Sequence, residues 1–305
     1  METVAQIFRA LCPMLLGLLF RLAGLFGDRE GEVLRKFVVR FTVPVFVFFS
    51  LYGAEPRSIA AIAPMAGAFV LMTGILFGVG YAASVFFAEP ARRTAVHACI
   101  TYGNYGWMGL GVMTALLGEA GAQRVIYFII LWWPVFYGFG LPIGFIHTRE
   151  QKGGVPVGKA LKVAAPPILA MALGLTLNLA GVQVPEFVGA VLRPFGEMTV
   201  PLILLSVGIM LDFGRIRASL PPAALVTGVT LLVGPLVGFT IANLLAPDPV
   251  TARTIILEGA MPVATLTPLL EENYAMDKDL VSTAVVLSTA VSLLTIPLFA
   301  GLVVG

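Results

Sequence analysis

Glu258 stands four residues before Pro262 within a long apolar stretch, and this pair is the first feature of the sequence that could do chemistry. Pro262 has no backbone N–H to donate and disfavours helical geometry at the residue before it, so a helix should break there. At membrane depth, the freed backbone groups need protein or a water-filled cavity around them. A broken helix with a carboxylate one turn before the break is therefore a candidate ion or substrate site.

The Glu258 carboxylate needs either a partner or a function, because a charge near the middle of a bilayer costs about 2.5–3.5 kcal/mol on insertion scales. It could bind Na⁺ together with freed backbone carbonyls, or take up a proton and lose its charge. The alternative is a position nearer the surface, paired with Arg253. We favour ion coupling, with Glu258 as a candidate Na⁺ ligand, and we predict that Met261, Pro262 and Val263 bind substrate.

A second glycine-rich segment follows Thr101, with four glycines in nine residues from Gly103 onward. Each glycine weakens a helix by about 1 kcal/mol relative to alanine, and glycine also permits the unwound backbone of a binding site. Asn104 offers both a donor and an acceptor there. The alternative is close helix packing through small residues, which we favour for Gly106 and Gly109. We predict that Thr101, Gly103 and Asn104 bind substrate.

Three further polar or aromatic features are open to more than one interpretation. His97 is a candidate proton carrier for ion coupling, although a histidine in an apolar run is more often structural. Arg40 and Glu197 each precede a proline by four residues, and we hypothesise that they approach each other. Trp132 and Trp133 fit either a membrane-interface belt or a local bend.

The composition predicts a helical integral membrane protein, since 58% of residues are hydrophobic and only 12% are charged. The sequence has no phosphate-binding GxxxxGK[ST] loop, no HExxH and no GxSxG, so we expect neither an ATP-driven pump nor an enzyme. We expect no cofactor other than Na⁺ and no nucleic-acid partner. Cys12 and Cys99 lie in apolar runs, where we predict buried free thiols. No cleavage site follows the first apolar run, which we interpret as a permanent span.

Windows of about 20 apolar residues predict ten spans. They cover residues 4–26, 33–53, 58–87, 92–118, 123–147, 158–180, 186–211, 219–246, 252–272 and 279–303. The charged and glycine-containing connection at 147–162 divides the chain into halves, and Thr42-Val43-Pro44 of the first half recurs as Thr199-Val200-Pro201 in the second. Five spans in each half require the second half to enter the membrane inverted, as in many secondary transporters.

Lysine and arginine in the short connections set the expected orientation. Connections after odd-numbered spans carry most of these residues, whereas those after even-numbered spans carry only Arg57, Arg124 and Arg253. We therefore expect the odd-numbered connections in the cytoplasm, both termini outside, and a location in the inner (cytoplasmic) membrane.

Several stretches carry a resemblance to a known family: PMLLGLLFRLAGLF at 13–26, FTVPVFVFFSL at 41–51, NYGWMGLGVMTALLGEAG at 104–121, PLILLSVGIML at 201–211 and EGAMPVATLTPLLEENYAMDKDLVSTAVVLSTAVSLLTIPL at 258–298. With these, the chain resembles the auxin efflux carrier family nearly end to end. More distantly, it is similar to the bile acid:sodium symporters of the same superfamily.

The resemblance implies an all-α fold of ten transmembrane helices in a five-plus-five inverted repeat, with repeats at 1–152 and 153–305. It further implies a scaffold of spans 1, 2, 6 and 7, and a transport domain of spans 3–5 and 8–10 that moves as an elevator. Spans 4 and 9 would cross at their breaks beside the bound anion. Asn104 matches the family asparagine and Pro262 the family proline, and Glu258 looks like the sodium-coordinating glutamate of the bile acid symporters. Gly103 and Gly111 stand where family members usually have proline.

We therefore expect a secondary transporter that carries a small organic anion, such as a carboxylate, across the lipid bilayer by alternating access, with Na⁺ or H⁺ coupling. The alternative is a bile-acid-type sodium:organic anion symporter, and a channel or membrane receptor is the third candidate. Elevator scaffolds often form dimers, which leaves a homodimer open.

Overall fold

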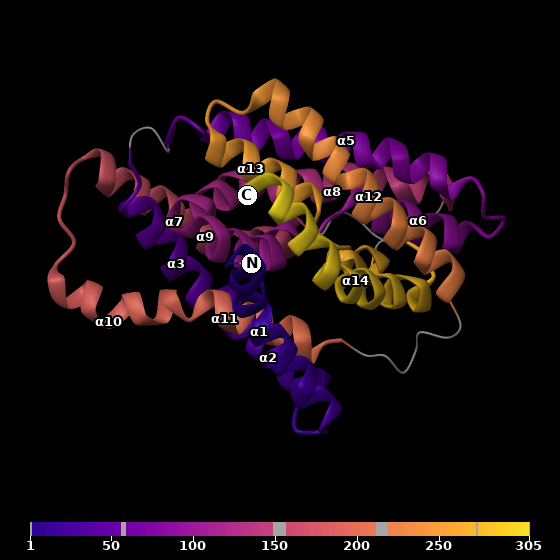
Figure 1. The fold of residues 1–305 in the computed structure, drawn as a ribbon, viewed down its shortest axis with the longest axis horizontal. Helices are drawn as coiled ribbons and strands as arrows, with labels where there is room; N and C mark the ends of the chain where they lie inside the picture. Colours follow the sequence, from indigo (N-terminus) through magenta and orange to yellow (C-terminus); the bar gives the residue numbers. More distant parts are fainter. Residues whose placement is uncertain (1, 56–58, 149–156, 212–218, 273, 305) are drawn as a thin grey trace.

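The structure is a computed structural model that describes residues 2–55, 59–148, 157–211, 219–272 and 274–304 (Figure 1). Its regular elements in this part of the chain are helices, and extended residues pair at one isolated bridge. Among the described residues, five helical stretches are long and apolar enough to cross a membrane: Ile62–Ser84, Tyr105–His147, Glu186–Ile209, Leu220–Leu245 and Lys278–Val303. The chain is thus helical and has the composition of a multi-pass membrane protein.

The first half of the chain forms a series of helices, two of which contain a π-helical turn, labelled η1 and η2 here. The elements are α1 (Glu2–Leu22), α2 (Asp28–Phe37), η1 (Val38–Thr42), α3 (Val43–Tyr52), α5 (Ile62–Ser84), α6 (Pro90–Thr101), η2 (Tyr105–Gly109), α7 (Leu110–Phe128), the 3₁₀ turn η3 (Ile129–Leu131) and α8 (Trp132–His147). Gly118 interrupts α7 with a φ of 64°, at the predicted end of the fourth span.

The second half forms a further series of helices. Its elements are α9 (Val157–Leu179), α10 (Glu186–Glu197), α11 (Thr199–Ile209), α12 (Leu220–Leu245), α13 (Pro249–Gly259), the 3₁₀ segment η5 (Thr267–Glu272) and α14 (Lys278–Val304). From the sequence, the stretch from Arg253 to Asn273 is expected to form two short helices that meet at 259–262. The first is α-helical, but the second is wrong, because the chain there forms only this 3₁₀ segment. The Thr267 N–H donates to the Ala264 carbonyl oxygen three residues earlier over 3.1 Å, so the segment begins with the tighter hydrogen-bond pattern of a 3₁₀ helix.

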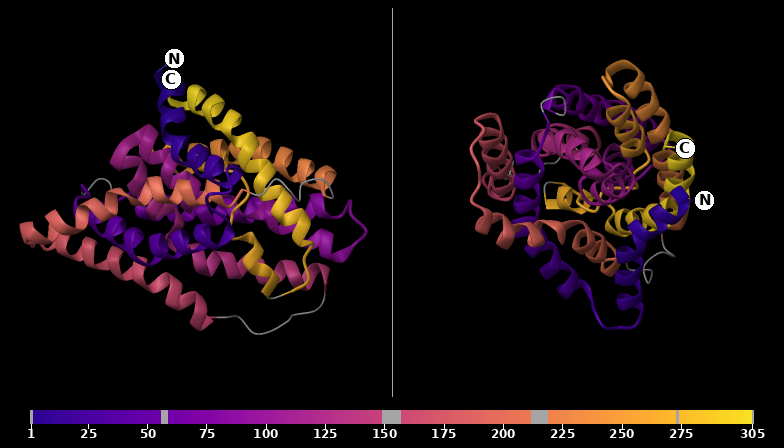
Figure 2. Two further views of the ribbon diagram at one scale, coloured as in Figure 1. Left: turned by 90° about the horizontal axis from the view of Figure 1, so that it is seen from below. Right: turned by 60° about the vertical axis from the view of Figure 1, so that its left-hand side comes forward.

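Helices from different halves pack in corresponding pairs. α1 packs against α11, and α3 packs against α9. Both contacts bring backbones together at glycine: a methyl group on Gly17 of α1 would overlap the Leu205 carbonyl oxygen of α11, and one on Gly174 of α9 would overlap the Phe48 carbonyl oxygen of α3. Figures 1 and 2 show α1 and α2 as a hairpin on one side of the molecule, with α5 and α13 on the opposite side.

The cysteine prediction was half wrong. Both thiols are free, and Cys99 is buried, but Cys12 is exposed on α1. In a membrane protein, lipid-facing and core-facing positions are equally apolar, because lipid tails are as apolar as a protein core. An apolar run therefore does not distinguish the two.

Candidate functional site

Two interrupted helices cross each other through short extended segments. α6 ends at Thr101 and α13 ends at Gly259, and beyond each end the backbone is non-helical. Gly103 and Val263 pair there as an isolated antiparallel bridge. The crossing thus joins the break after α6 in the first half of the chain to the break after α13 in the second half.

Two hydrogen bonds hold this bridge together. The Asn104 N–H donates to the Pro262 carbonyl oxygen over 2.7 Å, and the Ala264 N–H donates to the Tyr102 carbonyl oxygen over 2.9 Å. Each break therefore supplies the partners that the other lacks, which meets the demand for satisfied backbone groups in a buried segment.

The local sequence explains why the first break is sharp. A methyl group on Gly103 would overlap the ring of Tyr105, so the turn between them has no room for a side chain. The chain then re-enters a helix through η2, where the Met108 and Gly109 N–H groups both donate to the Asn104 carbonyl oxygen over 3.1 Å. Asn104 is the residue at which the helix restarts.

The Asn104 side chain is buried and unpaired. It is only 1% exposed, and neither its Nδ2 nor its Oδ1 has a hydrogen-bond partner within the described residues. Buried amides are normally satisfied, so an orphaned one calls for a ligand, a water or an ion. Asn104 lines a cavity of about 800 Å³, together with Ala264 and Leu266 from the second break.

The cavity has an aromatic wall and a basic end. Tyr105, Trp107, Trp132, Trp133 and Tyr137 form the wall. The two neighbouring tryptophans therefore face a cavity, an arrangement that neither sequence interpretation anticipated.

Charged residues of α2 and η1 form the basic end of the cavity. They are Glu32, Arg35, Lys36 and Arg40. Lys36 and Arg40 are exposed, whereas Asn104 is buried, so the cavity runs from the basic end down to the crossing.

Glu258 lies on α13 immediately before the second break and is fully buried, with 0% exposure. Neither carboxyl oxygen has a hydrogen-bond partner among the described residues, so the alternative of pairing with Arg253 is wrong. It is not among the residues that line the large cavity. The carboxyl group instead lies against Gly109 of η2, next to the crossing.

The other predicted substrate residues shape the crossing without lining the cavity. Thr101 Oγ1 donates to the His97 carbonyl oxygen over 2.7 Å, and the Met261 N–H donates to the Glu258 carbonyl oxygen over 3.1 Å. The Val263 N–H donates to Ser288 Oγ of α14 over 3.1 Å. The cavity thus includes Asn104 of the predicted set, but not Thr101, Gly103, Met261, Pro262 or Val263.

Two cavity residues of the second break were missed by sequence reasoning. Ala264 follows the bridge residue Val263, and Leu266 lies in the turn that the Thr267 N–H closes on the Ala264 carbonyl oxygen over 3.1 Å. The proline alone indicated only where the helix ends.

His97 is part of a pair and not of the cavity. Its Nδ1 lies 3.0 Å from Nε2 of His147, so the two histidines of this chain are in contact. The ring of Phe77 lies 4.4 Å from the His97 ring, centroid to centroid. His147 was not identified from the sequence, because nothing local signals a contact between residues on α6 and α8.

We expected Arg40 and Glu197 to approach each other, but they form no ion pair in the described part of the chain. Their helices do meet, since the rings of Phe41 and Phe195 lie 5.2 Å apart. Arg40 itself lines the cavity.

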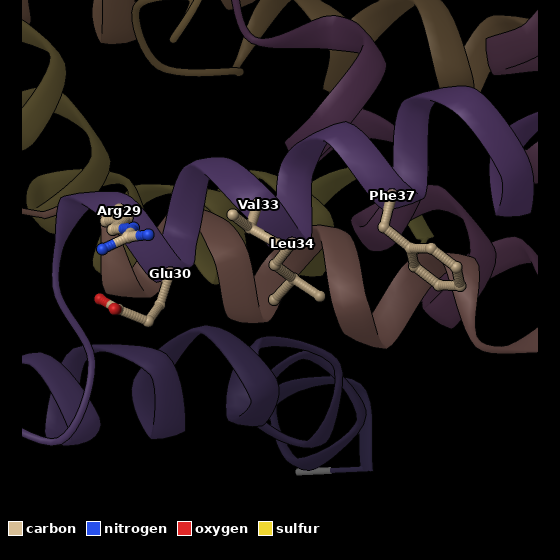
Figure 3. A pocket seen from close by; sticks show the side chains of 5 residues that line it. All are labelled: Arg29, Glu30, Val33, Leu34 and Phe37. Carbon is tan, nitrogen blue, oxygen red and sulfur yellow. The ribbon is translucent and has the colours of Figure 1, made fainter.

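A second hollow of about 430 Å³ lies on the outside of α2. Figure 3 shows its five lining side chains, all from that one helix: Arg29, Glu30, Val33, Leu34 and Phe37. None of them is buried. The charged residues Arg29 and Glu30 lie at one end of the hollow, and Phe37 lies at the other. This hollow lacks the buried, unpaired polar groups of the crossing, so we place the candidate site at the crossing.

Comparisons with known proteins agree over nearly the whole chain. The model of a family described as "Membrane transport protein" matches residues 1–153 and 157–300. An uncharacterised transporter of Methanothermobacter thermautotrophicus is 29% identical over 98% of both chains. Another, from Methanocaldococcus jannaschii, is 22% identical over 94% of both. A protein of Rhizobium meliloti named "Putative malonate transporter" is 23% identical over 88% of this chain and 87% of its own.

Proposed function

The chain belongs to the membrane transport protein family, as its resemblance to auxin efflux carriers implied, and from this premise we propose that it carries a small organic anion across the cytoplasmic membrane. The observation that carries the proposal is the Asn104 side chain, which is buried, unpaired and part of the cavity at the crossing. Its amide donates a hydrogen bond to a carboxylate of the substrate.

The restart of the helix at η2 adds to this anion site. The first N–H groups of a helix have no acceptor within it and carry partial positive charge. Tyr105, Gly106 and Trp107 are the first residues of η2, and all three line the cavity. A carboxylate that reaches Asn104 also meets this helix end.

Transport proceeds by alternating access between two sets of helices. The proposed scaffold, spans 1, 2, 6 and 7, corresponds to α1, α2–α3, α9 and α10–α11, and the remaining spans form the moving domain. The α1–α11 and α3–α9 contacts support this division. In the proposed repeat, α1 corresponds to α9 and α3 to α11, so the two contacts are equivalent. The repeats 1–152 and 153–305 would then be related as an inverted pair.

Cation coupling is proposed for Glu258. Its buried carboxyl group has no partner among the described residues, and a bound Na⁺ or proton would neutralise it. This observation also favours the second candidate function, a sodium:organic anion symporter of the bile-acid type, in which Na⁺ is obligatory. His97 remains a further proposed proton carrier, now together with His147.

Reconstitution into liposomes tests the proposal. Malonate is the first probe, because one relative is named "Putative malonate transporter". We expect saturable malonate uptake that accelerates when unlabelled malonate is trapped inside, as exchange through alternating access requires. Replacement of Na⁺ by choline separates the two candidates: it abolishes uptake only in an obligatory sodium symporter. Large currents without exchange would instead indicate a channel, and binding without any flux a receptor.

A further inference from the structure

Arg40 occupies an unusual place in the helix that carries it. It lies in the π-helical turn η1, in which the Val43 N–H bonds to the Val38 carbonyl oxygen five residues earlier. Pro44 has no N–H to offer the Arg40 carbonyl four residues before it, which disfavours an α-helical turn here. Such π-turns occur frequently at functional sites.

The charges around the cavity leave Arg40 without an ionic partner. Arg35 pairs with Glu32 over 2.7 Å, and Lys36 pairs with the same carboxylate over 3.4 Å. Within the described residues Arg40 has neither an ion pair nor a side-chain hydrogen bond, and Glu197 does not pair with it. The cavity thus has an uncompensated guanidinium at its basic end and an unpaired amide at its buried end.

Arg40 is exposed and lies in the predicted second span, and arginines within spans that face a cavity mark substrate pathways. A guanidinium presents a planar fork of donors that matches a carboxylate, and its charge is permanent. Arg40 is therefore suited to hold an acidic group that enters the same cavity as the anion at Asn104.

We propose that Arg40 is a second anion-binding residue of this cavity and that the protein consequently selects anions with two acidic groups over those with one. The inference rests on the proposed transport of organic anions and specifies their class. Asn104 and the start of η2 bind one carboxylate, and Arg40 binds the other, directly or through an ordered water.

A pair of ligands that differ by one charge tests this role. Binding of malonate and of its monomethyl ester to the purified full-length protein is measured by isothermal titration calorimetry, for the wild type, Arg40→Gln and Arg40→Lys. We expect the wild type to prefer malonate by about tenfold or more, since a charge-assisted contact is lost with the ester. Arg40→Gln should weaken malonate binding by a similar factor and change ester binding by less than about twofold. Arg40→Lys should retain part of the preference.

The matched control is Arg29→Gln, which removes the same charge from the neighbouring part of the chain, outside the cavity (Figure 3). It should leave the preference for malonate intact, and thermal unfolding confirms that each variant is folded. An equal loss for both ligands in Arg40→Gln, or no loss for either, would overturn the role of Arg40 while wild-type binding stands. Failure of the wild type to bind either ligand would overturn the proposed function for this ligand class, and Arg40's role with it.

Discussion

Glu258 and Gly109 are in direct contact beside the crossing: a methyl group on Gly109 would overlap both oxygens of the Glu258 carboxyl group. Gly109 is the last residue of η2 in the first half of the chain, and Glu258 is the penultimate residue of α13 in the second half. The glycine therefore provides the space in which the proposed cation-binding group lies. Sequence reasoning attributed Gly109 to helix packing, but its packing partner is a carboxyl group.

Gly109→Ala should destabilise the protein by about 1–3 kcal/mol, because the added methyl group has no free space. Combination with Glu258→Ala should remove much of this cost, since the overlapping atoms are gone. Denaturant unfolding in detergent measures both effects. As a control, Gly78→Ala in α5 meets nothing within 4 Å and should be neutral or slightly stabilising. Equal costs at the two glycines would contradict the contact.

Glu258→Gln should abolish any dependence of uptake on Na⁺ or on a proton gradient, because the amide carries no charge to neutralise. The variant should be at least as stable as the wild type, since a buried carboxylate without a partner is costly. Uptake assays in Na⁺ and in choline, at two pH values, provide the measurement. Glu119→Gln is the control, because Glu119 is exposed. Unchanged cation dependence in Glu258→Gln would make this residue structural.

Asn104→Ala should weaken malonate binding by about tenfold or more while the melting temperature stays the same or rises. The reason is that no hydrogen bond of the side chain is lost within the described residues, whereas a substrate partner is. Asn178→Ala should behave in the opposite way. The Asn178 amide donates to the carbonyl oxygens of Tyr52 and Ala54 over 2.6 and 3.0 Å, so its loss lowers stability and spares binding. Calorimetry and thermal unfolding of both variants separate the two roles.

Asp248 should make stability depend on acid pH. It caps α13, with Oδ1 accepting from the Thr251 N–H over 2.9 Å and Oδ2 from Thr251 Oγ1 over 2.6 Å. Burial raises the pKa of this carboxyl group, but the hydrogen bonds from Thr251 and the nearby Arg124 outweigh burial, so its pKa lies below the usual value.

A lowered folded-state pKa means that the stabilisation is complete above the unfolded-state pKa of about 3.9 and is lost as the pH falls through the folded-state pKa. Asp248→Ala should therefore cost about 0.5–2 kcal/mol at neutral pH, as for other helix caps, and progressively less below about pH 4. Unfolding of both proteins at pH 7, 5 and 3.5 measures this. A difference that stays constant down to pH 3.5 would contradict it.

The sequence indicated both helix breaks, because proline and glycine act on the backbone around them. Pro262 ends α13 within three residues, and Gly118 marks the interruption of α7. The crossing itself was expected only from the family resemblance, and the bridge between Gly103 and Val263 bears it out.

The cavity and its neighbours could not be predicted in the same way, because they depend on contacts between distant segments. The His97–His147 pair joins two helices, and the aromatic wall draws on η2 and α8. The exposure of Cys12 likewise depends on which side of α1 faces other helices. Periodicity in an all-apolar run carries little information about that choice.

Two hydrogen bonds join residues 102–104 to residues 262–264, which are far apart in the chain. During biosynthesis these two bonds can therefore form only late. When the first broken helix leaves the ribosome, the groups that will satisfy its backbone have not yet been synthesised. The bridge, and with it the crossing, can form only after residues 262–264 have been synthesised. Truncation before residue 262 should therefore leave a chain that inserts but does not complete its fold.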